Sequence, residues 1–105
     1  MANDLSQWSG KRLHFIGIGG AGMSGLARIA LSHGITVTGS DAKDSSVLSA
    51  LQTLGAQVWP EHKASQVDGA DFIIYSTAIA PTNVELIRAS ELQIPLLTRA
   101  QALAT

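Results

Sequence analysis

Short apolar runs alternate with longer amphipathic stretches along the 105-residue chain, and this alternation predicts its secondary structure. The short runs are aliphatic or β-branched and are bounded by Gly, Pro or Asp, as buried strands are. The longer stretches repeat apolar residues at intervals of three or four, as helices that cover a sheet do. The predicted strands are 13–18, 35–41, 56–59, 71–76 and 94–98, and the predicted helices are 20–32, 45–54, 83–92 and 99–105.

This order of elements predicts an α/β fold, because parallel strands need crossover connections and the intervening helices supply them. Right-handed crossovers then give a Rossmann-like, doubly wound, five-stranded parallel sheet of order 3-2-1-4-5, with helices on both faces. Ligands of such sheets bind at the carboxyl ends of the strands, where the strand order reverses. The rule gathers residues 17–24, 39–41 and 76–81 around one crevice.

Several side chains are expected to pack rather than to bind. In the second helix, Val47, Leu51 and Leu54 recur at helical spacing and are expected to form the buried face, before a glycine stop at Gly55. Two tryptophans and two histidines are given the same structural interpretation, because they lie beside apolar runs or at the ends of elements: Trp8, His14, His33 and Trp59.

Composition narrows the possible functions. The chain is 46% hydrophobic and 14% charged with a net charge of -1, so it can form a core and lacks the basic face typical of nucleic-acid binding. It has no cysteine, which excludes thiolate metal sites and cysteine nucleophiles, and we expect no metal site. The start of the chain is polar, and no apolar stretch reaches the roughly 18 residues of a membrane span. We therefore expect a cytoplasmic domain with no membrane insertion.

The densest chemical signal is GIGGAG at residues 17–22, which matches G-x-G-x-x-G between a predicted strand and a predicted helix. In that context Gly17 permits a tight turn, Gly19 lets the backbone approach a diphosphate, and Gly22 lets the helix pack close to the sheet. Backbone N–H groups at the helix start, with the positive end of its dipole, hold phosphate oxygens. The alternative is a glycine-rich turn that serves packing alone.

Asp41 is the second marker, 19 residues after Gly22 and at the end of the second predicted strand. In dinucleotide-binding folds a carboxylate at this position accepts hydrogen bonds from ribose hydroxyls and repels a 2′-phosphate, so spacing alone favours NAD. A solvated loop aspartate or a helix cap is the alternative. The pattern does not distinguish a dinucleotide from a UDP-sugar.

The complete residue sequences of the motifs are more specific than the glycines alone. Four segments resemble the amino-terminal domain of the Mur ligases: HFIGIGGAGMSGLA at 14–27, GSD at 39–41, STAI at 76–79 and IPLLTRAQALA at 94–104. The resemblance covers residues 12–105, which leaves residues 1–11 as a polar amino-terminal extension.

The resemblance implies a UDP-substrate-binding, Rossmann-like domain of a three-domain ATP-dependent ligase. Such a ligase joins L-alanine to the lactyl carboxylate of UDP-N-acetylmuramate during peptidoglycan synthesis, after ATP has activated the carboxylate as an acyl phosphate. The alternatives are the corresponding domain of a murein peptide ligase, an NAD-binding domain, and a protein-interaction module that binds no nucleotide.

The same motifs imply which residues contact the substrate. The glycine loop through Ser24 is expected to hold the diphosphate, although the spacing of Met23 also favours packing. Ser40 and Asp41 are expected at the uridine, and His62 is either near the nucleoside or in a surface loop. The hydroxyls that follow the fourth strand bond either the nucleotide or nearby backbone, and Arg99 suits a phosphate or sugar. The full candidate set is Gly19, Gly20, Ala21, Gly22, Met23, Ser24, Ser40, Asp41, His62, Ser76, Thr77, Ala78, Ile79 and Arg99.

No G-x-x-x-x-G-K-[ST] pattern occurs in the chain, so it lacks the phosphate loop that the resemblance implies for ATP. ATP, Mg²⁺ and L-alanine are therefore expected to bind the other domains of a longer ligase. We expect this chain to hold no cofactor and no catalytic residue, and to be inactive by itself.

Overall fold

The predicted strands pair into one parallel sheet of order β3-β2-β1-β4-β5, which confirms the predicted fold class. The structure is a computed structural model and describes residues 5–104. Residues 13–16 of the central strand are buried, because helices cover both faces of the sheet. The strands are β1 Arg12–Ile16, β2 Thr36–Ser40, β3 Gln57–Trp59, β4 Phe72–Tyr75 and β5 Leu96–Thr98.

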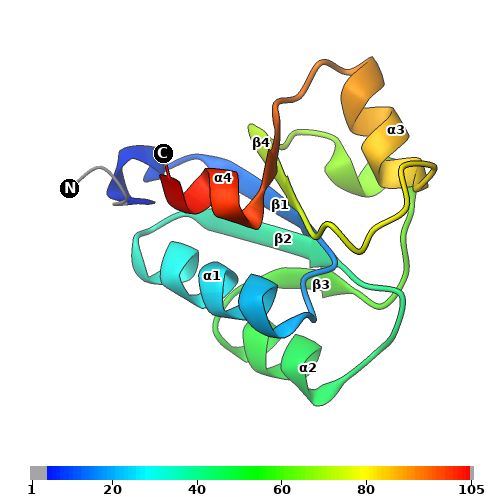
Figure 1. The fold of residues 1–105 in the computed structure, drawn as a ribbon. Coiled ribbons are helices and arrows are strands. Elements are labelled where there is room, and N and C mark those ends of the chain that lie inside the picture. Colours follow the sequence, from blue (N-terminus) through cyan, green and yellow to red (C-terminus); the bar gives the residue numbers. More distant parts are fainter. Residues whose placement is uncertain (1–4, 105) are drawn as a thin grey trace.

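Four α-helices follow the strands in the predicted order, and α3 lies on the opposite side of the sheet from α1 and α2 (Figure 1). Two short 3-10 helices at Leu5–Trp8 and Ala64–Val67 were not predicted, because a single turn carries no periodic signal. The α-helices are α1 Ala21–Ser32, α2 Ser46–Thr53, α3 Val84–Glu91 and α4 Arg99–Ala104.

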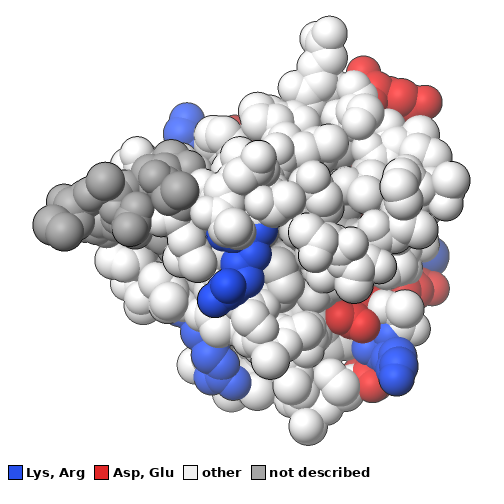
Figure 2. All heavy atoms as spheres, in the orientation of Figure 1, with Lys and Arg blue, Asp and Glu red and all other residues white. Residues whose placement is uncertain are grey.

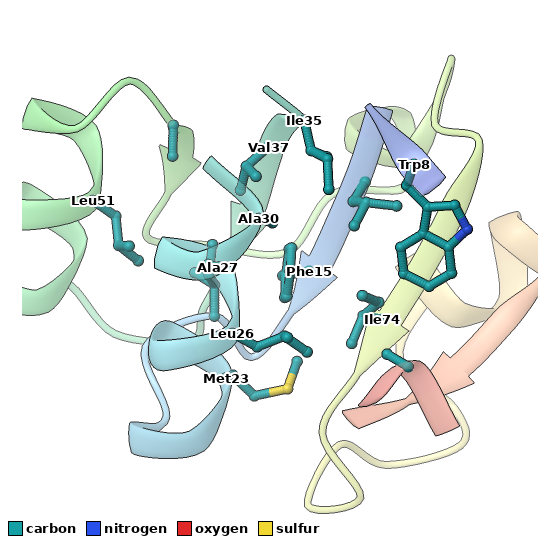
Figure 3. Close-up of a cluster of buried hydrophobic side chains, with 14 of the residues drawn as sticks. Trp8, Phe15, Met23, Leu26, Ala27, Ala30, Ile35, Val37, Leu51 and Ile74 are labelled. Atoms are coloured by element: carbon teal, nitrogen blue, oxygen red, sulfur yellow. The ribbon is translucent and has the colours of Figure 1, made fainter. Parts of the chain in front are cut away.

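The larger core cluster lies between the sheet and the helices α1, α2 and α4. In Figure 3, Phe15 of β1 and Ile74 of β4 lie close to the α1 side chains Met23, Leu26 and Ala27. The smaller cluster lies under α3 and the second 3-10 helix. The core is almost entirely aliphatic, as the low aromatic content predicts, and burial of this apolar surface is the main force that holds the sheet and helices together.

The buried face of α2 differs from the prediction. Leu48 and Leu51 are buried and Val47 is partly buried, whereas Leu54 is 52% exposed. Leu54 is the residue that caps the helix rather than part of its last turn, so the helical spacing no longer directs it toward the sheet. Gly55 follows with φ at +112°, as expected for a glycine stop.

Trp8 lies in the segment that the resemblance leaves as an amino-terminal extension, yet it packs in the larger core cluster. Its ring stacks on Phe72 with 5.2 Å between the ring centroids. Across the face drawn in Figure 2, charged side chains of both signs are scattered among neutral ones. In residues 5–104 no helix is long and apolar enough to cross a membrane.

Candidate functional site

A tight glycine turn joins β1 to α1 at the carboxyl edge of the sheet. Gly17 has φ at +87°, a conformation that glycine adopts without strain, and a Cβ added there would lie 3.2 Å from the Cβ of Ser76. The N–H groups of Gly17 and Ile18 both donate to the carbonyl of Ser40, at 2.8 and 3.0 Å. The turn is therefore held against β2 and passes close to the loop that follows β4.

Beside this turn is a cavity of about 400 Å³ at the carboxyl ends of β4 and β5. The amino-terminal turn of α1 lines it, and the first N–H groups of a helix have no carbonyl partner within that helix. Seven candidate residues meet here, and three further residues were missed because nothing in the sequence marks them. The lining residues are Gly20, Ala21, Gly22, Met23, Ser76, Thr77 and Arg99, with Tyr75, Thr98 and Ala100 in addition.

Arg99 connects the two sides of this cavity. Its Nε donates a hydrogen bond to the carbonyl of Gly22, at 3.0 Å. A Cβ on Gly22 would lie 2.8 Å from that Nε and 3.1 Å from the Arg99 Cδ. Gly22 therefore makes room for the arginine side chain rather than for a strand of the sheet, which corrects the predicted reason for the glycine.

Asp41 holds the glycine loop from the opposite side. Its Oδ2 accepts a hydrogen bond from the N–H of Gly19 at 2.8 Å, and its Oδ1 accepts one from the N–H of Lys43 at 3.2 Å. A Cβ on Gly19 would lie 2.8 Å from Asp41 Oδ2. In this structure the lack of a side chain at Gly19 leaves room for the Asp41 carboxylate, and the hydrogen bond between them fixes the position of the loop.

Seven candidates lie outside the lining of the cavity: Gly19, Ser24, Ser40, Asp41, His62, Ala78 and Ile79. Ser24 donates its hydroxyl to the carbonyl of Ala21 at 3.1 Å, and the N–H of Ala78 donates to Ser76 Oγ at 3.2 Å. The alternative in which the hydroxyls after the fourth strand bond local backbone thus describes Ser76 here, and Ser24 also bonds local backbone. Ile79 packs over Gly17 and lines a separate apolar cavity next to α3.

Ser40 and His62 belong to a buried polar network on the α3 side of the sheet. Ser40 is fully buried, and its Oγ lies 2.9 Å from His62 Nδ1 and 2.7 Å from Glu85 Oε1. His14 Nε2 lies 2.6 Å from the same carboxylate oxygen, and His14 Nδ1 lies 2.7 Å from Thr38 Oγ1. Ser40 is therefore enclosed, and only His62 of this group is partly exposed.

Glu85 is the centre of this network and was missed by sequence reasoning. It lies in the first turn of α3, where an acidic residue is usually a solvated partner of the helix dipole, and the N-cap Asn83 accepts from its N–H. Its second oxygen accepts from the N–H of Lys63 at 3.0 Å. The available signal was His14, a polar residue inside an apolar strand, because a buried imidazole needs partners.

The hydrogen bonds keep Glu85 ionised despite its burial. Burial alone raises the pKa of this carboxyl group, but hydrogen bonding and charge from His14, with hydrogen bonds from Ser40 and the Lys63 N–H, outweigh it. The pKa of Glu85 therefore lies below its ordinary value of 4.5. A fully buried carboxylate is tolerated here because donors surround it.

The comparisons with known proteins show the family and the fold of the chain. Residues 12–105 match the model of the family described as "Mur ligase family, catalytic domain". The chain belongs to the Mur ligase family. Among similar curated Mur ligases, the UDP-N-acetylmuramate–L-alanine ligase of Persephonella marina is 47% identical over 90% of this chain and 20% of its own length. The corresponding ligase of Caldanaerobacter subterraneus is 50% identical over 98% of this chain and 22% of its own length.

Solved structures of the family have the same fold. The UDP-N-acetylmuramate–alanine ligase of Thermotoga maritima matches 85% of this chain and 21% of its own, with a TM-score of 0.82 and 32% identity. A murein peptide ligase of Psychrobacter arcticus matches 90% of this chain and 20% of its own, with a TM-score of 0.83 and 24% identity, which supports the fold alone. The chain spans about a fifth of the length of the curated relatives that it matches.

Proposed function

We propose that this chain binds the UDP part of UDP-N-acetylmuramate and anchors that substrate for a ligase that adds L-alanine. The observation that carries the proposal is the cavity beside the glycine turn, where the start of α1 and the Arg99 guanidinium meet. Helix amino termini and guanidinium groups are the two protein features best suited to phosphate oxygens. The diphosphate would lie between them.

The names of the relatives favour a UDP-sugar over NAD. The similar curated proteins described above are UDP-N-acetylmuramate–L-alanine ligases, and each shares close to half of its aligned residues with this chain. The carboxylate of Asp41, which favoured NAD by its spacing, is already engaged with the Gly19 N–H.

The residues of this chain do not fit a site for ATP and Mg²⁺. The sequence has no phosphate-loop pattern, and residues 5–104 contain no group of three side chains able to hold a metal ion. On this proposal ATP, Mg²⁺ and L-alanine bind other parts of a longer ligase. The purified chain should therefore form no alanyl product and hydrolyse no ATP, and either activity would contradict that assignment.

A titration tests the proposed ligand. UDP-N-acetylmuramate, UDP and NAD are added separately to ¹⁵N-labelled chain, and the amide shifts of residues 17–24 and 76–79 are followed. We expect saturable shifts with the two uridine ligands and none with NAD. Saturation by NAD without a response to UDP would overturn the proposal in favour of a dinucleotide-binding domain.

Gly19→Val tests the loop. The backbone at Gly19 does not have a positive φ, and the atoms nearest to an added Cβ are those of the Asp41 carboxylate, which can turn away only by giving up its hydrogen bond to the Gly19 N–H. The variant should fold and lose most of its affinity for UDP, because the new methyl groups fill the approach to the loop. Gly25→Ala is the matched control, since Gly25 lies on α1, the helix that follows the loop, with no atom within 4 Å of the added Cβ.

A further inference from the structure

The buried network behind the carboxyl edge of the sheet fixes where its protons lie. Glu85 is fully buried and ionised, and an ionised carboxylate only accepts hydrogen bonds. Ser40 has one hydroxyl proton, and that proton must point to Glu85 Oε1, 2.7 Å away. The Ser40 oxygen is then an acceptor toward His62 Nδ1, at 2.9 Å, so the ring proton of a neutral His62 is on Nδ1.

The other ring nitrogen of His62 is open to a ligand. Within residues 5–104, Arg12 Nε is the only buried side-chain nitrogen or oxygen that lacks a hydrogen-bond partner. His62 Nε2 has no hydrogen-bond partner in the same part of the chain, so this atom cannot be buried and must reach the surface. The His62 side chain as a whole is 16% exposed. With the proton on Nδ1, Nε2 presents a lone pair.

We propose that Glu85 is a positioning residue that acts through Ser40 to hold His62 in its Nδ1–H form, so that Nε2 accepts a hydrogen bond from a hydroxyl or N–H of the nucleoside. This inference rests on the proposed function, since it assumes a uridine ligand at this edge. It gives the candidate residue Ser40 a role through His62, because Ser40 itself is fully buried.

The same network predicts what happens when Glu85 becomes neutral. In Glu85→Gln the amide NH₂ is disfavoured at the Oε2 position, because the Lys63 N–H points there at 3.0 Å. The side-chain NH₂ of Gln66 points there too, at 2.7 Å, when the Gln66 amide takes the orientation that satisfies both of its polar atoms. The NH₂ therefore takes the Oε1 position and donates to Ser40 and to His14 Nε2. Ser40 then donates its own proton to His62 Nδ1, and the His62 proton moves to Nε2.

The two histidines should therefore exchange tautomers together. When both rings are neutral, this order places the His14 proton of the wild-type chain on Nε2, which donates to Glu85, and the His62 proton on Nδ1. In Glu85→Gln, His14 carries its proton on Nδ1, which donates to Thr38 Oγ1, and His62 carries it on Nε2. Of the donors in this network only the Thr38 hydroxyl loses its acceptor, His14 Nδ1, so we expect the variant to fold with reduced stability.

Long-range ¹H–¹⁵N spectra of histidine-labelled chain at pH 8 distinguish the two neutral tautomers of each ring from one another and from the doubly protonated ring. Thr38→Val is the matched control. It removes a hydroxyl of the same network from β2, the strand that also carries Ser40, but Thr38 does not contact His62. We expect the wild-type chain and Thr38→Val to show His62 protonated on Nδ1, and Glu85→Gln to show it protonated on Nε2. UDP should shift the Nε2 signal of the wild-type chain.

UDP affinity completes the test. Replacing the accepting lone pair by an N–H should weaken UDP binding about tenfold in Glu85→Gln, and Thr38→Val should stay within about twofold of wild type. A wild-type His62 protonated on Nε2, an unchanged tautomer in Glu85→Gln, or unchanged UDP affinity after the tautomer has moved would each overturn the inference. Failure of the wild-type chain to bind UDP is a different result, which overturns the proposed function itself.

Discussion

Gly39→Ala tests the close contact between β2 and Ile18, which only glycine at position 39 permits. Gly39 lies in β2 beneath the buried side chain of Ile18, the residue between Gly17 and Gly19 in the glycine turn. A Cβ on Gly39 would lie 2.8 Å from Ile18 Cβ and 3.0 Å from Ile18 Cγ2. Ile18 Cβ is fixed to the backbone, so the side chain cannot rotate out of the way and the turn itself must shift.

Two opposing effects set the size of the change. Alanine in a strand is favoured over glycine by about 0.5–1 kcal/mol, because glycine loses more backbone freedom on folding. Forcing a methyl group into a filled core costs about 1–3 kcal/mol. The clash is the larger effect, so Gly39→Ala should lower the free energy of unfolding by about 1–2 kcal/mol, or roughly 4–16 °C in melting temperature.

Urea unfolding, followed by circular dichroism, measures the effect, and a lower midpoint with an unchanged m-value identifies it as lost stability. Gly25→Ala is the matched control on α1. No atom lies within 4 Å of its added Cβ, so it should raise the free energy of unfolding by about 0.5–1 kcal/mol. If Gly39→Ala proves as stable as wild type, Ile18 does not rest on Gly39 and the close-approach reasoning is wrong.

Three further predictions concern the core, the carboxylate and the arginine. Leu51→Ala should lower the free energy of unfolding, measured by chemical denaturation, by about 2–5 kcal/mol, because Leu51 is fully buried. Leu54→Ala should change it by less than about 0.5 kcal/mol, because Leu54 is exposed. Equal losses in the two variants would refute the assigned face of α2. The folded pKa of Glu85 lies below its ordinary value of 4.5, so its contribution is present above about pH 4.5 and is lost as the pH falls through the lowered value. Urea unfolding between pH 6 and pH 3 should therefore show a smaller loss of stability in Glu85→Gln than in wild type, and parallel curves would contradict the assigned pKa direction. Arg99→Ala should weaken UDP binding at least tenfold with little change in stability, since Arg99 is exposed. Calorimetry compares it with Arg28→Ala, which removes another exposed arginine, and equal UDP affinities in the two variants would show that Arg99 is not part of the site.

Much of the fold could be predicted because its signals are local. Each strand is an apolar run, each helix has apolar residues at helical spacing, and Gly34 and Gly55 mark helix ends with positive φ. The strand order followed from the handedness of crossover connections, which is a general property of polypeptides. The error at Leu54 arose where a helix ends, because periodicity does not say which turn is the last.

The candidate site was only partly predictable, for a physical reason. The glycine motif and Arg99 were found because each residue type has a narrow use near phosphate, and the structure brings them together at the cavity. The partners of these residues were not visible: Gly22 accommodates Arg99, and Gly19 accommodates Asp41. Both contacts join segments far apart in the chain, and no local pattern encodes such a distance.

Sequence alone thus determined the α/β sheet, the position of the glycine turn and the resemblance to the Mur ligases. These features depend on local backbone preference and on motifs that are contiguous in the chain. Tertiary structure alone decided the proton order of the network around Glu85, which joins β1, β2, α3 and the loop that follows β3. A buried carboxylate is stable only when donors from distant segments surround it, so its role is settled by packing and not by its neighbours in sequence.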